Sequence, residues 1–266
     1  MHLSARSLLV PFCLFLALIL MIGCDTDNDN NSDTPPSTEH VWVVLGDDSV
    51  QMMLRDLPKI TVEGEEAIRL NEFVTTTLVP NLVVNDTVFY DYRALYGYRI
   101  VGEDGFSAHD NRGYADNIWA HFHLGYMLVS NRRAIFPDDS IDLAGAYNVT
   151  GMRFIRLYRK FDVQIPDTTS FVELNDVTPV TVTNPDGEPE SALPLSDFVT
   201  LIVTAPENFQ YNLRSLDDFG PTTNMTWAQF QTGYWLLTSQ RTMFNDTTLI
   251  GGRYRLRHLE SIQVLP

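Results

Sequence analysis

Two histidines separated by one residue are the side chains best suited to metal chemistry in this sequence. His121 and His123 follow Trp119 in the segment WAHFHLGY. In a β-strand both imidazoles would lie on one face, where they would chelate zinc or copper once a third ligand joined them. In a helix, Trp119, Phe122 and Tyr126 would share an apolar stripe and the histidines would be poorly aligned. His121 and His123 are therefore a candidate metal pair, with a structural or solvated role as the alternative.

The same segment occurs a second time in the chain. Residues 119–138 align without a gap with residues 227–246, and the second copy has Gln229 and Gln231 in place of the two histidines. Three further pairs of segments keep the same order: Leu70–Val74 with Leu195–Val199, Tyr98–Phe106 with Tyr211–Phe219, and Gly145–Tyr147 with Gly252–Tyr254. Matching segments in a fixed order indicate an internal duplication.

The duplication draws attention to aromatic and basic residues that both copies retain. Duplicated domains commonly enclose a cleft, and we expect the shared aromatics to line it as a binding surface. For each shared arginine we expect a salt bridge to the aspartate that follows it, Asp138 or Asp246, with anion capture as the alternative. The candidate ligand-binding residues are Trp119, Tyr126, Arg133, Trp227, Tyr234 and Arg241.

An acidic turn also occurs in both copies, at Asp104–Phe106 and Asp217–Phe219. A side-chain bond from the aspartate to the backbone, followed by an aromatic residue in the core, accounts for this pattern. The alternative is a pair of carboxylates at the mouth of a pocket.

No catalytic motif accompanies these residues. The sequence has no serine–histidine–acid arrangement, P-loop, glycine-rich dinucleotide fingerprint or HExxH helix. Its two cysteines, Cys13 and Cys24, both precede the body, which therefore has no disulfide, thiolate ligand or cysteine nucleophile. We favour a non-enzymatic protein, and the sequence requires no cofactor.

Short strands and few helices are expected to position the candidate residues. The predicted class is α+β, mostly β, in two tandem repeated units at 40–165 and 166–266. We predict strands at 41–45, 59–62, 87–90, 98–101, 134–136, 147–149 and 154–158, and then at 180–183, 200–204, 211–214, 243–244, 254–257 and 261–264. Helices are predicted at 70–79 and 195–199 and around the two tryptophans.

The start of the chain indicates export and lipid attachment. Leu8–Ile22 is an apolar run preceded by Arg6, too short for a confident membrane span but typical of a signal peptide. It ends in LMIGC, which resembles the lipobox of bacterial lipoproteins, where the cysteine becomes the acylated N-terminus. We predict a signal peptide at 1–23 and acylation of Cys24, by palmitate or similar chains, with a plain secretory peptide or short anchor as the alternative.

Composition restricts the compartment and the partners. Residues 24–39 are acidic and carry almost no apolar side chains, so we predict a disordered tether. The chain has 34 acidic and 18 basic residues, a net charge of −16, which disfavours nucleic acid as a partner. We expect a protein anchored by lipid to the cell membrane or outer membrane, facing the periplasm or the exterior.

An ordered series of short segments resembles the sulfite-oxidase-type molybdopterin-binding fold. It consists of Leu54–Pro58, Ile68–Val74, Asp104–Phe106, Gly125–Tyr126 and Val149–Val163, and it recurs more loosely over 175–265. Enzymes of that family hold molybdenum through a cysteine thiolate, which this body lacks, so the resemblance implies a scaffold that has lost, or never had, the metal chemistry. No catalytic residue can be transferred.

These observations predict an envelope lipoprotein that acts as a non-catalytic binding or structural module, with a small ligand or an envelope protein as partner. The alternative is a molybdopterin- or metal-dependent oxidoreductase, or an accessory protein of one.

Overall fold

The computed structural model describes residues 39–74, 78–79, 82–84, 88–112, 117–137, 145–249 and 251–266. The predicted signal peptide, Cys24, nearly all of the tether and Asp138 lie outside these residues. Strands hold 44% and helices 20% of the structure, which confirms the predicted α+β, mostly β class. Among the described residues, no helix combines the length and apolar character needed to cross a membrane.

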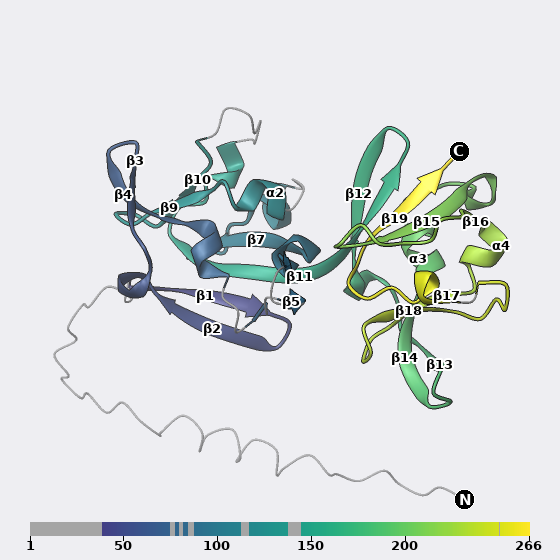
Figure 1. Ribbon diagram of the computed structural model, residues 1–266. Coiled ribbons are helices and arrows are strands. Elements are labelled where there is room, and N and C mark those ends of the chain that lie inside the picture. The colour runs from purple at the N-terminus through teal and green to yellow at the C-terminus, as the bar shows by residue number, and fades with distance from the viewer. Residues whose placement is uncertain are drawn as a thin grey trace, which may run out of the picture. The chain divides into compact units, whose positions relative to one another are not determined.

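The first half of the body alternates short strands with one-turn helices (Figure 1). Its elements are β1 (His40–Leu45), β2 (Asp48–Met53), η1 (Leu54–Asp56), β3 (Ile60–Val62), β4 (Glu65–Arg69), η2 (Leu70–Phe73), β5 (Leu82–Val84), β6 (Val88–Tyr90), η3 (Tyr92–Leu95), β7 (Tyr96–Gly102), α1 (Ala108–Arg112), β8 (Asn117–Ile118), α2 (Trp119–Phe122), β9 (Tyr126–Leu128), β10 (Arg133–Ile135) and η4 (Gly145–Tyr147).

The second half follows nearly the same order after β11 (Met152–Ile165). Its elements are β12 (Thr168–Glu173), η5 (Leu174–Asp176), β13 (Val180–Thr183), β14 (Pro189–Pro194), α3 (Leu195–Thr200), η6 (Pro206–Asn208), β15 (Gln210–Ser215), β16 (Met225–Thr226), α4 (Trp227–Phe230), β17 (Gly233–Leu236), β18 (Arg241–Phe244), η7 (Gly252–Tyr254) and β19 (Leu259–Leu265).

Strand β11 belongs to both halves. Its first part pairs in parallel with β1, at Phe154–Leu157, and its second part pairs in parallel with β19, at Asp162–Gln164. Strand β7 runs antiparallel to the first part of β11, as β15 does to β19. The first part of β11 thus closes one repeat as β19 closes the other, and its second part opens the second repeat as β1 opens the first. Figure 1 shows β11 extending from one repeat into the other.

Smaller sheets complete each repeat in the same way. One sheet has the strand order β10-β9-β4-β3, and its counterpart has the order β18-β17-β14-β13. Both repeats bury a stacked aromatic pair in the core. Tyr98 lies 4.0 Å from Phe122 and Tyr211 lies 4.5 Å from Phe230 between ring centroids. Because all four rings are fully buried, each contributes about 1.5–3 kcal/mol of hydrophobic stabilisation.

Three predicted strands are wrong, although their β-branched and aromatic residues favour extended structure. Residues 147–149 and 254–257 instead follow or overlap the one-turn helices η4 and η7. Residues 200–204 continue from α3, because the Val203 amide donates to the Val199 carbonyl at 2.7 Å. Of the helix predicted at 70–79, the described residues form the single turn η2, and residues 75–77 lie outside the described part of the chain. Local hydrogen bonding therefore overrides side-chain propensity at these positions.

Candidate functional site

The series of apolar side chains on one face of β11 is interrupted at its centre. Ile155 and Leu157 are buried in the core of the first repeat, whereas Phe161 and Val163 are buried in the core of the second. Successive side chains in a strand alternate between faces, so the intervening residue of this apolar series is Arg159. A charged side chain thus occupies the position where one hydrophobic core ends and the next begins.

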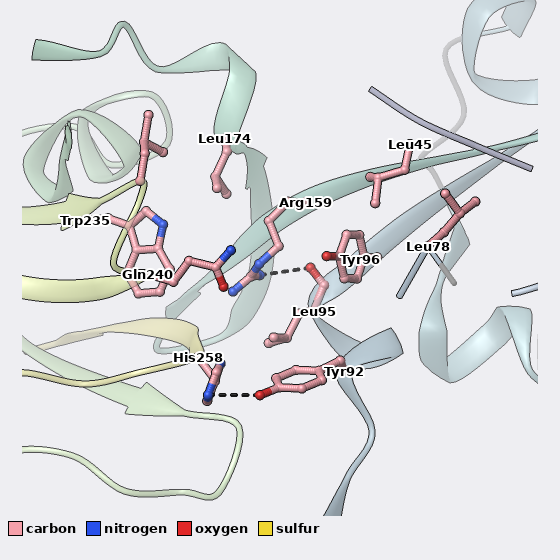
Figure 2. A pocket seen from close by; sticks show the side chains of 11 residues that line it. Leu45, Leu78, Tyr92, Leu95, Tyr96, Arg159, Leu174, Trp235, Gln240 and His258 are labelled. Atoms are coloured by element: carbon pink, nitrogen blue, oxygen red, sulfur yellow. Dashed lines mark hydrogen bonds between the residues drawn. The ribbon is translucent and has the colours of Figure 1, made fainter. Parts of the chain in front are cut away.

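A cavity of about 540 Å³ opens at this break, and we call it the junction cavity (Figure 2). Residues from both repeats line it, and apolar side chains form slightly more than half of the lining. The apolar residues are Leu45, Leu78, Leu95, Leu174, Trp235 and Leu237, and the polar residues are Tyr92, Tyr96, Arg159, Gln240 and His258.

Backbone carbonyls of both repeats hold Arg159 in place. Its Nη1 donates to the carbonyl oxygens of Leu95 at 2.9 Å and Lys160 at 2.5 Å, and its Nη2 donates to that of Leu259 at 2.6 Å. A guanidinium has five N–H donors, so two remain after these bonds. Arg159 forms no ion pair with any described residue. Burial lowers the pKa of Arg159 to about 10, and the side chain therefore stays charged at neutral pH.

Tyr92 and His258 connect the repeats across the same cavity. The Tyr92 hydroxyl and His258 Nε2 are hydrogen-bonded at 2.9 Å, and the ring centroids lie 4.8 Å apart (Figure 2). Burial, together with the charges of Arg159 and Arg257, lowers the pKa of His258, and Asp217 opposes this effect. Burial raises the pKa of Tyr92 to about 12. At neutral pH both groups are therefore uncharged.

Two of the lining residues have left-handed backbone conformations. Gln240 has φ 50° and His258 has φ 54°. His258 immediately precedes β19, and the residue that precedes β11 in the first repeat is Gly151, with φ 63°. For a residue other than glycine this conformation costs about 1–2 kcal/mol. Such strain is retained most often at functional sites. Because the other repeat folds with glycine at this point, the imidazole is not required by the local fold.

None of the six ligand-binding residues predicted from the sequence lines the junction cavity. The indoles of Trp119 and Trp227 pack against the buried Tyr98 and Tyr211, at 5.7 and 5.3 Å between centroids. Tyr126 lies beneath the Arg69 guanidinium at 5.5 Å. A binding role for these aromatics stays a prediction.

Of the remaining three predicted residues, two are adjacent in sequence to residues that line the cavity. Tyr234 packs in a small apolar cluster beside the cavity-lining Trp235. Arg241 is half-buried and adjoins the cavity-lining Gln240, whereas Arg133 is exposed.

The histidine pair lies on and just after a helical turn. His121 belongs to α2, and His123 Nδ1 is hydrogen-bonded to the Trp119 carbonyl oxygen at 2.8 Å. No group of three or more potential metal ligands occurs among the residues that the structure describes. Metal binding by His121 and His123 stays a prediction, and it would need a ligand from elsewhere.

The expected salt bridge of Arg241 with Asp246 does not form. The carboxylate of Asp246 instead accepts hydrogen bonds from the Thr248 amide at 2.8 Å and the Thr248 hydroxyl at 2.6 Å. These two bonds lower the pKa of Asp246. A short local turn therefore satisfies the aspartate without the arginine.

The predicted acidic turns are present. The Phe106 amide donates to Asp104 Oδ1 at 2.9 Å, and the Phe219 amide donates to Asp217 Oδ1 at 3.3 Å. Phe106 packs against the first core, but Phe219 is 43% exposed, so the expectation of a core aromatic is wrong for the second copy.

No protein-family model, curated protein or solved structure was found to match the chain. The likeness to the sulfite-oxidase-type fold therefore stays a prediction, and the site has to be judged from its own geometry.

Proposed function

We propose that this chain is a lipoprotein of the bacterial cell envelope whose body binds a small ligand in the junction cavity without catalysing a reaction. The observation that carries the proposal is the cavity at the centre of β11, where the apolar series is interrupted by Arg159. A purely structural junction between two repeats would be filled by apolar side chains packed to the density of a core.

The size and lining of the cavity support ligand binding. Small-molecule sites typically enclose about 300–1,000 Å³ and have mostly apolar walls with a few polar groups that fix orientation. The junction cavity has this volume and this kind of lining. Two lining residues, Gln240 and His258, also hold strained backbone conformations.

The envelope location is supported by the sequence that precedes the body. An apolar run ends at Cys24 in a lipobox-like segment and continues as an acidic tether. Acyl chains on Cys24 would hold the body at a membrane surface, and the tether would let it reach ligands in the periplasm or outside the cell.

A cavity-blocking variant tests the binding proposal. We expect the neutral fluorophore N-phenyl-1-naphthylamine to bind the purified body saturably. Leu237→Trp should weaken this binding about tenfold or more, because Leu237 lines the cavity and is exposed enough to accept a larger side chain. The matched control is Leu201→Trp, because Leu201 is exposed and does not line the cavity. No saturable binding, or equal effects of the two substitutions, would contradict the proposal.

A further inference from the structure

We infer that the ligand of the junction cavity is an amphipathic organic anion whose acidic group binds Arg159 and whose apolar part contacts the leucine and tryptophan walls. This inference rests on the proposed function, because it names the class of ligand for the same cavity.

The lining of the junction cavity is positively charged at neutral pH. The chain carries 34 acidic residues against 18 basic ones, yet none of the lining residues that the structure describes is aspartate or glutamate. Of the nearby carboxylates, Asp162 is engaged by Lys160 in an ion pair, and Glu260 forms none with Arg159. Among the described residues of the lining, the one that is charged at neutral pH is thus a cation, Arg159. Asp162 and Glu260 act on Arg159 electrostatically, but neither lines the cavity or pairs with the guanidinium, so the positive lining is suited to an anionic ligand.

Hydrogen-bond donors are available at the positively charged side of the cavity. Arg159 uses three N–H groups for backbone carbonyls and keeps two, enough for a bidentate contact with a carboxylate, sulfonate or phosphate. The Tyr96 hydroxyl and the Gln240 side chain lie beside the guanidinium (Figure 2). Burial raises the pKa of Tyr96, which keeps its hydroxyl protonated and able to donate. Several donors therefore converge where the guanidinium lies.

The apolar walls of the cavity favour an organic anion over an inorganic one. Leu45, Leu95, Leu174 and Trp235 form apolar walls on the remaining sides, and a free phosphate or sulfate would leave them in contact only with water. An apolar body attached to the acidic group would remove that surface from water, at about 25 cal/mol per Å².

Two fluorophores that differ only in an acidic group test the inference. The anionic probe is 8-anilinonaphthalene-1-sulfonate, and N-phenyl-1-naphthylamine is the same molecule without the sulfonate. We expect the wild-type body to bind the sulfonate about tenfold more tightly or better, as a charge-assisted hydrogen bond would produce. Sodium sulfate should displace the sulfonate probe only weakly, compared with sodium chloride at the same ionic strength.

The decisive variant is Gln240→Glu, which adds one negative charge beside Arg159 without removing any of its hydrogen bonds. Gln240 is exposed at the rim, so the fold should tolerate the change. We expect the preference for the sulfonate over the neutral probe to fall about tenfold. Gln231→Glu is the matched control, because Gln231 is exposed and does not line the cavity. Arg159→Met should abolish the preference, and circular dichroism shows whether that variant folds.

The outcomes separate the two proposals. If both probes bind equally, or if Gln240→Glu leaves their ratio unchanged, the anion inference fails while the binding function stands. If sulfate competes as well as the sulfonate probe, the site takes inorganic anions and the amphipathic class is wrong. If neither probe binds, the proposed function fails and the inference fails with it.

Discussion

Replacing His258 by alanine and by glycine should show an unusual order of stability. At ordinary positions glycine is about 0.5–1 kcal/mol worse than alanine, because it loses more backbone entropy on folding. His258 has φ 54°, a left-handed conformation that costs a residue with a Cβ atom about 1–2 kcal/mol. Both variants lose the same hydrogen bond to Tyr92 and the same ring contact, so these losses cancel in the comparison.

The remaining difference in the free energy of unfolding is the backbone strain of alanine minus the extra backbone entropy that glycine loses on folding. We expect His258→Ala to be less stable than His258→Gly by about 0.5–1 kcal/mol. Relative to wild type, the glycine variant should lose only about 1 kcal/mol, since relief of strain offsets part of the lost hydrogen bond. The internal precedent is Gly151, which has φ 63° before the equivalent strand of the first repeat.

Equilibrium unfolding in urea measures this difference directly. The free energy of unfolding of the two variants should fall with urea concentration at the same slope. The midpoint of unfolding should lie at a higher urea concentration for the glycine variant than for the alanine variant. If alanine is equal to glycine or better, residue 258 does not have the left-handed conformation. This wall of the cavity would then store no backbone strain.

Three further predictions concern packing, pH and location. Gly233→Ala should lower the free energy of unfolding, measured in urea, by about 1–3 kcal/mol, because the added Cβ would lie 2.5 Å from Phe244 Cε1. The control Gly252→Ala should lower it by less than about 0.5 kcal/mol, because the added Cβ would have no neighbour within 4 Å. The pKa of His258 is lower in the folded state than in the unfolded state, so protonation favours unfolding. The free energy of unfolding of the wild type, relative to that of His258→Gly, should therefore fall as the pH drops below 6.5. A difference that does not change with pH would contradict this prediction. Cys24→Ser should move the protein from the membrane to the soluble fraction, and retention in the membrane would exclude acylation of Cys24 as the anchor.

Much of the framework could be predicted from the sequence. The turn-rich succession of short β-forming segments predicted a mostly β fold, and the helical regions predicted around Trp119 and Trp227 are the single turns α2 and α4. In these turns the tryptophan and the phenylalanine three residues later share one face, and both contact the tyrosine of the neighbouring strand. The spacing of those aromatics carried the information.

The candidate site was missed for a reason connected with the duplication. Residues that both copies retain are those that each copy needs to fold, and they are mainly core residues such as Phe122 and Phe230. The lining of the junction cavity includes residues that differ between copies, such as His258, whose counterpart is Gly151. A comparison of the repeats therefore identifies core residues and leaves out residues of the cavity that only one copy has.

One signal for Arg159 was present in the sequence. Residues 152–165 alternate in a way that predicts a strand, and the apolar series Ile155, Leu157, Phe161, Val163 has an arginine at its centre. A prediction that ended the strand at Tyr158 concealed the break, since the arginine then appeared to follow the strand. Only the full length of β11 makes it a charged residue between two cores.

A crystal structure of the body with bound 8-anilinonaphthalene-1-sulfonate would test the central claim most directly. We predict density for one molecule between the two repeats, with a sulfonate oxygen within hydrogen-bonding distance of the Arg159 guanidinium and the naphthalene against Trp235. A probe seated elsewhere, for example over the exposed Leu201, with the junction cavity holding only water, would contradict the account.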